Sequence, residues 1–317
     1  MGNAQAVNMP VPSQISSPVP SQVSSQVSSP VSSPAPQTTS QIIQPVPTTV
    51  PIGNISYNKA LHIGINYEGT SHELRGCIND TITISELTKK DVLDIRRLFL
   101  TDHTKYKPDI KNIQQAFKWL RCRKCDNSGL WSCPHNYNHH PDTTLYFSYS
   151  GHGSQVKDTD GDEIDGRDET LYALDGHITD DYMFSNLIYP IPSGVRLWCI
   201  LDCCHSSTSL DLQFSIEDIN GNRFTLVDNN DKTCKGDVVM VSGCLDHQTS
   251  ADAYINNSFQ GAMTAALKHI LAKYPNIKMM ELFKELRIYM ENNNYTQRPA
   301  ISFGGNLNLA NTFLSTS

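Results

Sequence analysis

The sequence predicts an α/β fold with a mainly parallel sheet and helices on both of its faces. From Lys59 onward, short apolar runs alternate with stretches of helical pattern, which is typical of this class. The run at 195–202 (VRLWCILD) has the character of a buried strand. Polar and reactive residues follow the runs at 144–151 and 195–202 directly, and the ends of parallel strands are where such sheets carry their sites.

The elements are expected in the following order. The apolar run at 60–67 (ALHIGINY) is a strand, and a helix over 79–90 starts near Asp80. The run at 96–101 (RRLFLT) is a second strand, and the helical pattern resumes over 107–122. Further strands are expected at 144–151, 195–202, 237–243 and 300–305, with helices at 180–191, 258–274 and 279–293.

The first 55 residues have a different composition from the rest of the chain. No charged residue precedes Lys59, and the stretch is an imperfect repeat of Ser, Pro, Val and Gln. It is too poor in large apolar side chains to build a core, so we expect a disordered Pro/Ser-rich arm over 1–55, before a folded domain over 56–317. Its prolines lack PxxP spacing and basic flanks, which favours a spacer or prodomain over an SH3 ligand.

Charge and composition exclude several classes of function. The net charge of −7 does not favour nucleic acid or an anionic membrane as a partner. The N-terminus lacks the basic and apolar regions of a secretory signal, and no apolar run is long enough to span a membrane. Nine cysteines, an odd number without framework spacing, fit reduced thiols in the cytoplasm.

Two strand ends carry the residues of a possible nucleophilic site. His152 stands between two glycines after one strand, and Cys203 and Cys204 follow the other. If the strands are parallel, the histidine could activate a cysteine, with the amides of Gly153 and Cys204 as oxyanion donors. The alternative is a capped strand end with a satisfied histidine, and the residues alone do not separate the two interpretations.

The motifs resemble those of the type I metacaspases, a family of caspase-like cysteine peptidases. The stretch YFSYSGHGSQ, with DCCHSS after it, resembles the histidine and nucleophile motifs of that family. The stretches HIGINYEGTSHELRGCIND, DETLYALDGHITDDYM, SGCLDHQTSADA and TQRPAISF are similar to its other blocks, over about 59–303. The resemblance implies a caspase-like α/β/α sandwich and a monomer. It implies a large-subunit-like part over 56–211, a cleavable linker over about 212–236 and a small-subunit-like part over 237–317.

The resemblance implies a peptidase that cuts protein or peptide substrates after Arg or Lys through a thioester. The dyad would be His152 and Cys204, with Cys203 packed beneath, and Ser207 stands where the family has Gly. The implied pocket for the basic side chain consists of Cys77, Asp80, Ser150 and Asp202. Two carboxylates suit a guanidinium. Without the resemblance, Asp80 reads better as an acid that complements a helix dipole.

Three further predictions concern metals and self-cleavage. The resemblance implies a regulatory Ca²⁺ site at Asp168, Asp180, Asp181 and Asp211, since hard oxygen ligands suit this ion. An EF-hand is rejected because Glu163 stands where the turn glycine belongs. The insertion over 122–140 offers Cys122, Cys125, Cys133 and His135 as a possible structural Zn²⁺ site, although free surface cysteines are an alternative. Self-cleavage is expected after Arg223, Lys232 or Lys235, in a polar stretch that resembles a loop.

Two other functions compete with this one. An Asp-specific caspase would need a basic pocket, which the acidic candidates oppose. A non-catalytic scaffold acting through the Pro/Ser-rich arm is the alternative from a different class. Degenerate peptidase folds usually lose the histidine or the cysteine, whereas His152 and Cys204 are both present.

Overall fold

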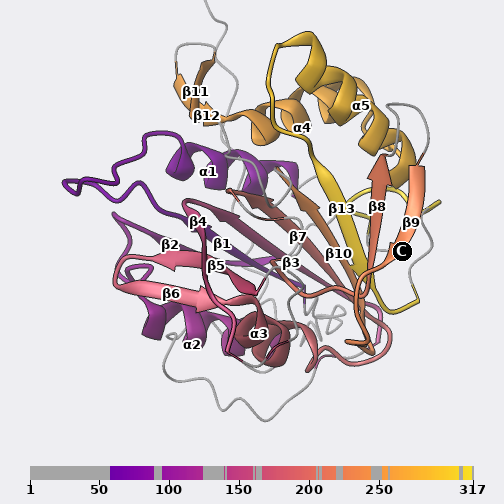
Figure 1. The fold of residues 1–317 in the computed structure, drawn as a ribbon, viewed down its shortest axis with the longest axis horizontal. Helices are drawn as coiled ribbons and strands as arrows, with labels where there is room; N and C mark the ends of the chain where they lie inside the picture. The colour runs from indigo at the N-terminus through magenta and orange to yellow at the C-terminus, as the bar shows by residue number, and fades with distance from the viewer. Residues whose placement is uncertain are drawn as a thin grey trace, which may run out of the picture. The chain divides into compact units, whose positions relative to one another are not determined.

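The structure is a computed structural model of residues 1–317, shown in Figure 1. It describes residues 58–88, 95–123, 139, 141–159, 161, 166–204, 206, 209–218, 224–243, 252–255, 258–306 and 310–315. The predicted arm lies outside these residues. Outside them also lie Cys125, Cys133, His135, Ser207 and Arg223.

Within the described part of the chain, an eight-stranded sheet has the order β2-β1-β3-β7-β10-β13-β8-β9. Its strands are β1 (Lys59–Gly64), β2 (Arg96–Thr101), β3 (Thr143–Ser150), β7 (Val195–Asp202), β8 (Phe214–Asp218), β9 (Phe224–Asp228), β10 (Asp237–Ser242) and β13 (Ala300–Gly304). The strands from β2 to β10 pair in parallel. The pairs from β10 through β13 and β8 to β9 are antiparallel. The prediction of a mainly parallel sheet is confirmed.

Helices cover both faces of this sheet (Figure 1). One face carries α1 (Cys77–Leu87), α4 (Ala262–Lys273) and α5 (Met279–Asn292), and the other carries α2 (Ile110–Arg121), α3 (Asp180–Met183) and the π-helix η2 (Phe184–Ile188). The buried apolar side chains accordingly form two clusters, one on each side of the sheet. This is the three-layer arrangement that the resemblance implied.

Local sequence explains why the central elements form where they do. All eight residues of β3 are buried, as expected for a strand covered on both faces. Helix α2 begins after Pro108, and the side chain of its N-cap residue Asp109 accepts a hydrogen bond from the backbone N–H of Asn112 (2.7 Å). Its residues Ile113 and Phe117 lie four positions apart and are both fully buried, which fixes the helix against the sheet.

Four segments differ from the sequence prediction. The helix expected over 258–274 begins at Ala262, because β12 (Ser258–Gly261) pairs with β11 (Asp252–Ile255). The helix expected over 180–191 changes to π geometry at Phe184. A small sheet of β4 (Gly153–Lys157), β5 (Arg167–Ala173) and β6 (Gly176–Thr179) was not predicted. The expectation of a loop over 212–236 is wrong for β8 and β9, which form a hairpin at one edge of the main sheet.

Candidate active site

The two predicted catalytic residues lie at the same edge of the sheet. Strands β3 and β7 pair in parallel, with Ser150 opposite Asp202. His152 and Cys204 each follow their strand by two residues. The backbone of Gly153 lies directly against Cys204, because a Cβ built on Gly153 would be 1.8 Å from the Cys204 carbonyl oxygen. Only glycine fits there without displacing the nucleophile loop.

The two adjacent cysteines differ in exposure. Cys203 is fully buried in the apolar cluster on the α2 side of the sheet, whereas Cys204 is partly exposed. A nucleophile must be reached by substrate, so Cys204 is the better candidate of the two.

The imidazole of His152 is fixed by its surroundings. Its Nε2 atom lies 2.8 Å from the backbone carbonyl oxygen of His72. A carbonyl oxygen only accepts hydrogen bonds, so Nε2 carries the proton, and Nδ1 is the basic nitrogen of the neutral ring. The ring also packs against the ring of Tyr67, with centroids 4.8 Å apart. The same carbonyl stabilises the imidazolium that forms after proton uptake.

Two buried tyrosines hold the backbone of His152, a role that no motif in the sequence indicates. The Tyr67 hydroxyl accepts a hydrogen bond from the His152 N–H (2.9 Å) and donates one to the Tyr172 carbonyl (2.6 Å). The Tyr149 hydroxyl donates to the His152 carbonyl (2.7 Å). Burial raises the pKa of both phenols above the ordinary tyrosine value. Both therefore stay neutral and can act as donors.

The two acids predicted for the pocket, Asp80 and Asp202, lie at the sheet edge that carries His152 and Cys204, and both are buried. Asp80, in the first turn of α1, accepts hydrogen bonds from the Ser150 hydroxyl (2.7 Å) and from the Gly261 N–H (2.9 Å). Asp202 accepts from the N–H and the hydroxyl of Thr264, both at 2.9 Å. Cys77, the first residue of α1, is buried as well. The structure thus joins Asp80, Ser150 and Asp202 through direct contacts and strand register.

Sequence reasoning missed Gly261 and Thr264. Gly261 precedes α4 and contacts both acids: its N–H binds Asp80, and a Cβ on it would lie 2.1 Å from Oδ2 of Asp202. Thr264 lies in the first turn of α4, so Asp202 also faces the positive end of that helix dipole. A glycine before a helix is the available signal, but the helix predicted over 258–274 places Gly261 inside the helix rather than before it.

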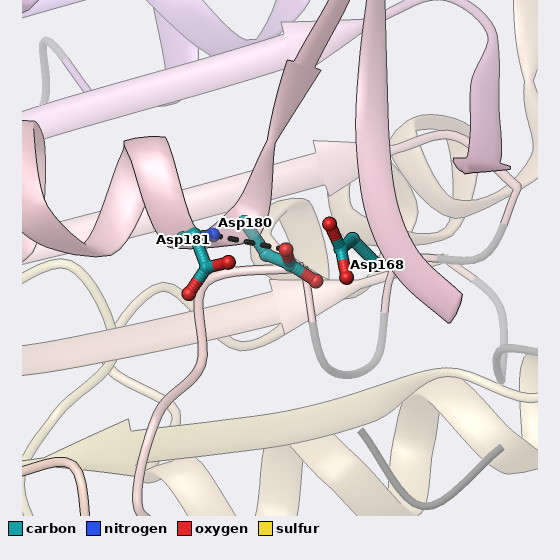
Figure 2. A group of neighbouring side chains, drawn as sticks. All are labelled: Asp168, Asp180 and Asp181. Carbon is teal, nitrogen blue, oxygen red and sulfur yellow. Dashed lines mark hydrogen bonds between the residues drawn. The ribbon is translucent and has the colours of Figure 1, made fainter. Parts of the chain in front are cut away.

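The four predicted calcium ligands are also brought together. Asp168 lies in β5, and Asp180 and Asp181 begin α3 (Figure 2). These three side chains offer oxygen atoms that all lie within 4.8 Å of one another. Burial and the charge of Asp211 raise the pKa of Asp180 to about 9. Asp211 is joined to Asp181 by the ammonium group of Lys232, which lies 2.7 Å from Asp211 Oδ2 and 2.9 Å from Asp181 Oδ1. We call Asp168, Asp180, Asp181 and Asp211 the acid cluster.

The remaining predicted positions are only partly described. Cys122 is the buried residue at the C-terminus of α2, but its three proposed zinc partners lie outside the described residues, so the zinc site stays a prediction. Arg223 also lies outside them. Lys235 is exposed, and Lys232 is the residue that binds the acid cluster. In the described part of the chain, no helix combines the length and apolarity needed to cross a membrane.

Fold and site together are those of a caspase-type protein, and comparison with known proteins agrees. The family model for the caspase domain matches residues 57–307, so the chain belongs to the caspase-domain family. Metacaspase-1 of Schizosaccharomyces pombe is 33% identical over 298 residues, and metacaspase-1B of Neurospora crassa is 35% identical over 297. Each of these alignments covers 77% of this chain and 66% of the relative. These relatives confirm the resemblance to type I metacaspases.

One solved structure is informative about the fold alone. A protein of Geobacter sulfurreducens aligns with a TM-score of 0.57 at 21% identity, covering 80% of this chain and 96% of that one. The agreement supports the three-layer architecture and says nothing about activity.

Proposed function

We propose that this protein is a cysteine endopeptidase that cuts after Arg or Lys. The observation that carries the proposal is the juxtaposition of His152 with Cys204 at one sheet edge, with two buried carboxylates beside them. Membership of the caspase-domain family supports the peptidase chemistry. The cytoplasmic location and the monomeric state stay predictions.

The proposed chemistry uses the ring nitrogen of His152 that does not bind the His72 carbonyl. Nδ1 of His152 takes the proton from the Cys204 thiol, and the thiolate attacks the substrate carbonyl carbon. The N–H groups of Gly153 and Cys204 would hold the resulting oxyanion. His152 then gives its proton to the departing amine, which leaves a thioester. Water, activated by the same imidazole, hydrolyses the thioester and restores the thiol. Throughout, the His72 carbonyl and the two tyrosines keep the ring in place.

The acids near the dyad favour a basic side chain in the substrate. Asp80 and Asp202 are both at least 95% buried, and a nearby opposite charge favours the ionised form of a carboxyl group. An Asp side chain of a substrate would be repelled by them. This is the physical support for Arg or Lys, rather than Asp, at the cleavage position.

The proposal includes calcium activation and self-processing. The acid cluster fits Ca²⁺ because its donors are hard carboxylate oxygens from three segments of the chain. Bound Ca²⁺ would order these segments and neutralise their charge, and it would take no part in bond cleavage. Self-cleavage would fall after Arg223, Lys232 or Lys235.

Hydrolysis of fluorogenic peptides tests this function. Peptides ending in Arg, Lys or Asp are incubated with the protein, with and without millimolar Ca²⁺. We expect turnover of the Arg and Lys peptides only, dependent on Ca²⁺, and none in Cys204→Ala. Cys203→Ala is the matched control, because it removes the adjacent buried thiol, and it should retain activity. Turnover of the Asp peptide would contradict the pocket assignment, and no turnover in folded protein would favour the scaffold function.

A further inference from the structure

Lys232 is a cation supplied by the chain itself to the acid cluster. Its ammonium group binds Asp181 and Asp211 at 2.9 and 2.7 Å, and it also lies 5.8 Å from the centre of the Phe184 ring. Only 24% of the Lys232 side chain is exposed. Lys232 lies 51 residues from Asp181 and 21 residues from Asp211 in the sequence.

The segment that carries Lys232 is tied down next to the cluster. The backbone N–H of Asn229 donates to the Gln213 carbonyl (2.7 Å), and its side chain donates to the Leu212 carbonyl (3.2 Å). The side chain of Asn230 accepts from the Lys232 N–H (2.9 Å). These bonds hold residues 229–232 against 211–213, so the ammonium group reaches the acids from a fixed backbone.

An ammonium group and a divalent cation would use the same oxygen atoms. Ca²⁺ binds carboxylate oxygens at about 2.3–2.6 Å and needs six to eight of them, counting water. Nζ of Lys232 is hydrogen-bonded to Oδ1 of Asp181 and Oδ2 of Asp211. It therefore partly neutralises the negative charge of the acid cluster and occupies two oxygen atoms that could otherwise bind Ca²⁺. Lysine can leave readily, because its charge sits at the end of a flexible four-carbon stem.

We infer that Lys232 is a tethered competitor of Ca²⁺, which displaces its ammonium group and thereby releases the side chain of a cleavage position. This inference rests on the proposed function, because it assumes that the acid cluster binds Ca²⁺. It adds an order of events. While its ammonium group binds the cluster, Lys232 is unavailable to the pocket of Asp80 and Asp202. After displacement, the same side chain becomes a substrate for self-cleavage.

Calcium binding tests the competition directly. Isothermal titration with CaCl₂ is done in the Cys204→Ala background, which prevents self-cleavage. The variants are Lys232→Met, which removes the charge, Lys232→Arg, which keeps it, and Lys235→Met, which removes an exposed neighbouring charge. A competitor that is docked nine-tenths of the time weakens apparent affinity about tenfold. We therefore expect Lys232→Met to bind Ca²⁺ about tenfold more tightly, with Lys232→Arg and Lys235→Met within about threefold of the parent.

Digestion with a lysine-specific endoproteinase tests the release. In the Cys204→Ala protein, cutting after Lys232 should require Ca²⁺, whereas cutting after exposed Lys235 should occur with and without it. Thermal unfolding adds a third readout: without Ca²⁺, Lys232→Met should melt at a lower temperature than the parent, and Ca²⁺ should close the gap.

The possible results distinguish failure of the competition from failure of the proposed calcium-activated peptidase function. If Lys232→Met binds Ca²⁺ no more tightly than the parent, the competition is refuted and the calcium site stands. If neither protein binds Ca²⁺, calcium activation and the competition both fail, and peptide hydrolysis still decides the peptidase activity. Equal cutting after Lys232 in both conditions would refute the release.

Discussion

Substitution of Gly261 by alanine should damage the proposed substrate pocket while leaving the proposed nucleophile, Cys204, intact. The added Cβ would lie 2.1 Å from Oδ2 of Asp202 and 2.6 Å from its Cγ. Side-chain Cβ atoms essentially never approach another atom closer than 3.0 Å, so the carboxylate or the backbone must move by about 1 Å. The Gly261 N–H that binds Asp80 at 2.9 Å would move with the backbone.

The size of the effect follows from the hydrogen bonds at stake. Oδ2 of Asp202 accepts two bonds from Thr264, each 2.9 Å long. Hydrogen bonds to a charged group contribute about 1.5–3 kcal/mol each. A displaced carboxylate that loses about 3 kcal/mol of its interaction with a basic substrate side chain would lower kcat/KM about 100-fold. Gly243 offers a graded control, because a Cβ there would lie 3.1 Å from Oδ1 of Asp202, so Gly243→Ala should lose less than about tenfold.

The assay combines kcat/KM for an Arg peptide with the rate at which iodoacetamide alkylates Cys204, followed by mass spectrometry of the cysteine peptides. We expect Gly261→Ala to lose turnover and to keep the alkylation rate. Turnover within twofold of the parent, in protein with an unchanged melting temperature, would refute the contact between Gly261 and the pocket. A loss of alkylation as well would mean that the substitution disturbs the dyad.

Three more predictions concern the dyad and the fold. Tyr67→Phe removes an acceptor for the His152 N–H, so kcat should fall about tenfold or more with KM little changed. Gly153→Ala places a Cβ 1.8 Å from the Cys204 carbonyl, so peptide turnover should vanish; activity within tenfold of the parent would contradict the packing. Burial lowers the pKa of His139 to about 4, so the unfolded state binds a proton first as pH falls, and stability is lost below about pH 6.5. Between pH 7 and 5 this loss is about 2 kcal/mol, measured by urea unfolding, and His139→Gln should lose about 2 kcal/mol less than the parent; equal losses would refute the assignment.

The sequence by itself predicted the central parallel strands and placed His152 and Cys204 directly after two of them. Strands β3 and β7 form at the apolar runs of the sequence. A strand that is buried on both faces is apolar along nearly its whole length, so its composition alone reveals it. Because both are central parallel strands, their C-terminal ends lie at the same edge of the sheet. His152 and Cys204, which come directly after these ends, are therefore brought to that edge. The acids of the pocket and of the acid cluster came from the resemblance to the metacaspases, since spacing alone says nothing about distance.

Only the tertiary structure decided the contacts between segments distant in sequence. Strand β8 belongs to the main sheet through pairing with β13, which lies more than 80 residues later, and its short polar sequence resembles a loop. Glycine is needed at position 261 because the Asp202 side chain occupies the space that a Cβ would take. The φ of Gly261 is an ordinary −64°, so its local conformation does not reveal this need. Lys232 reads as one surface lysine among several. Its role depends on four carboxylates gathered from three segments by the fold, and the electrostatic cost of burying them exists only once they meet.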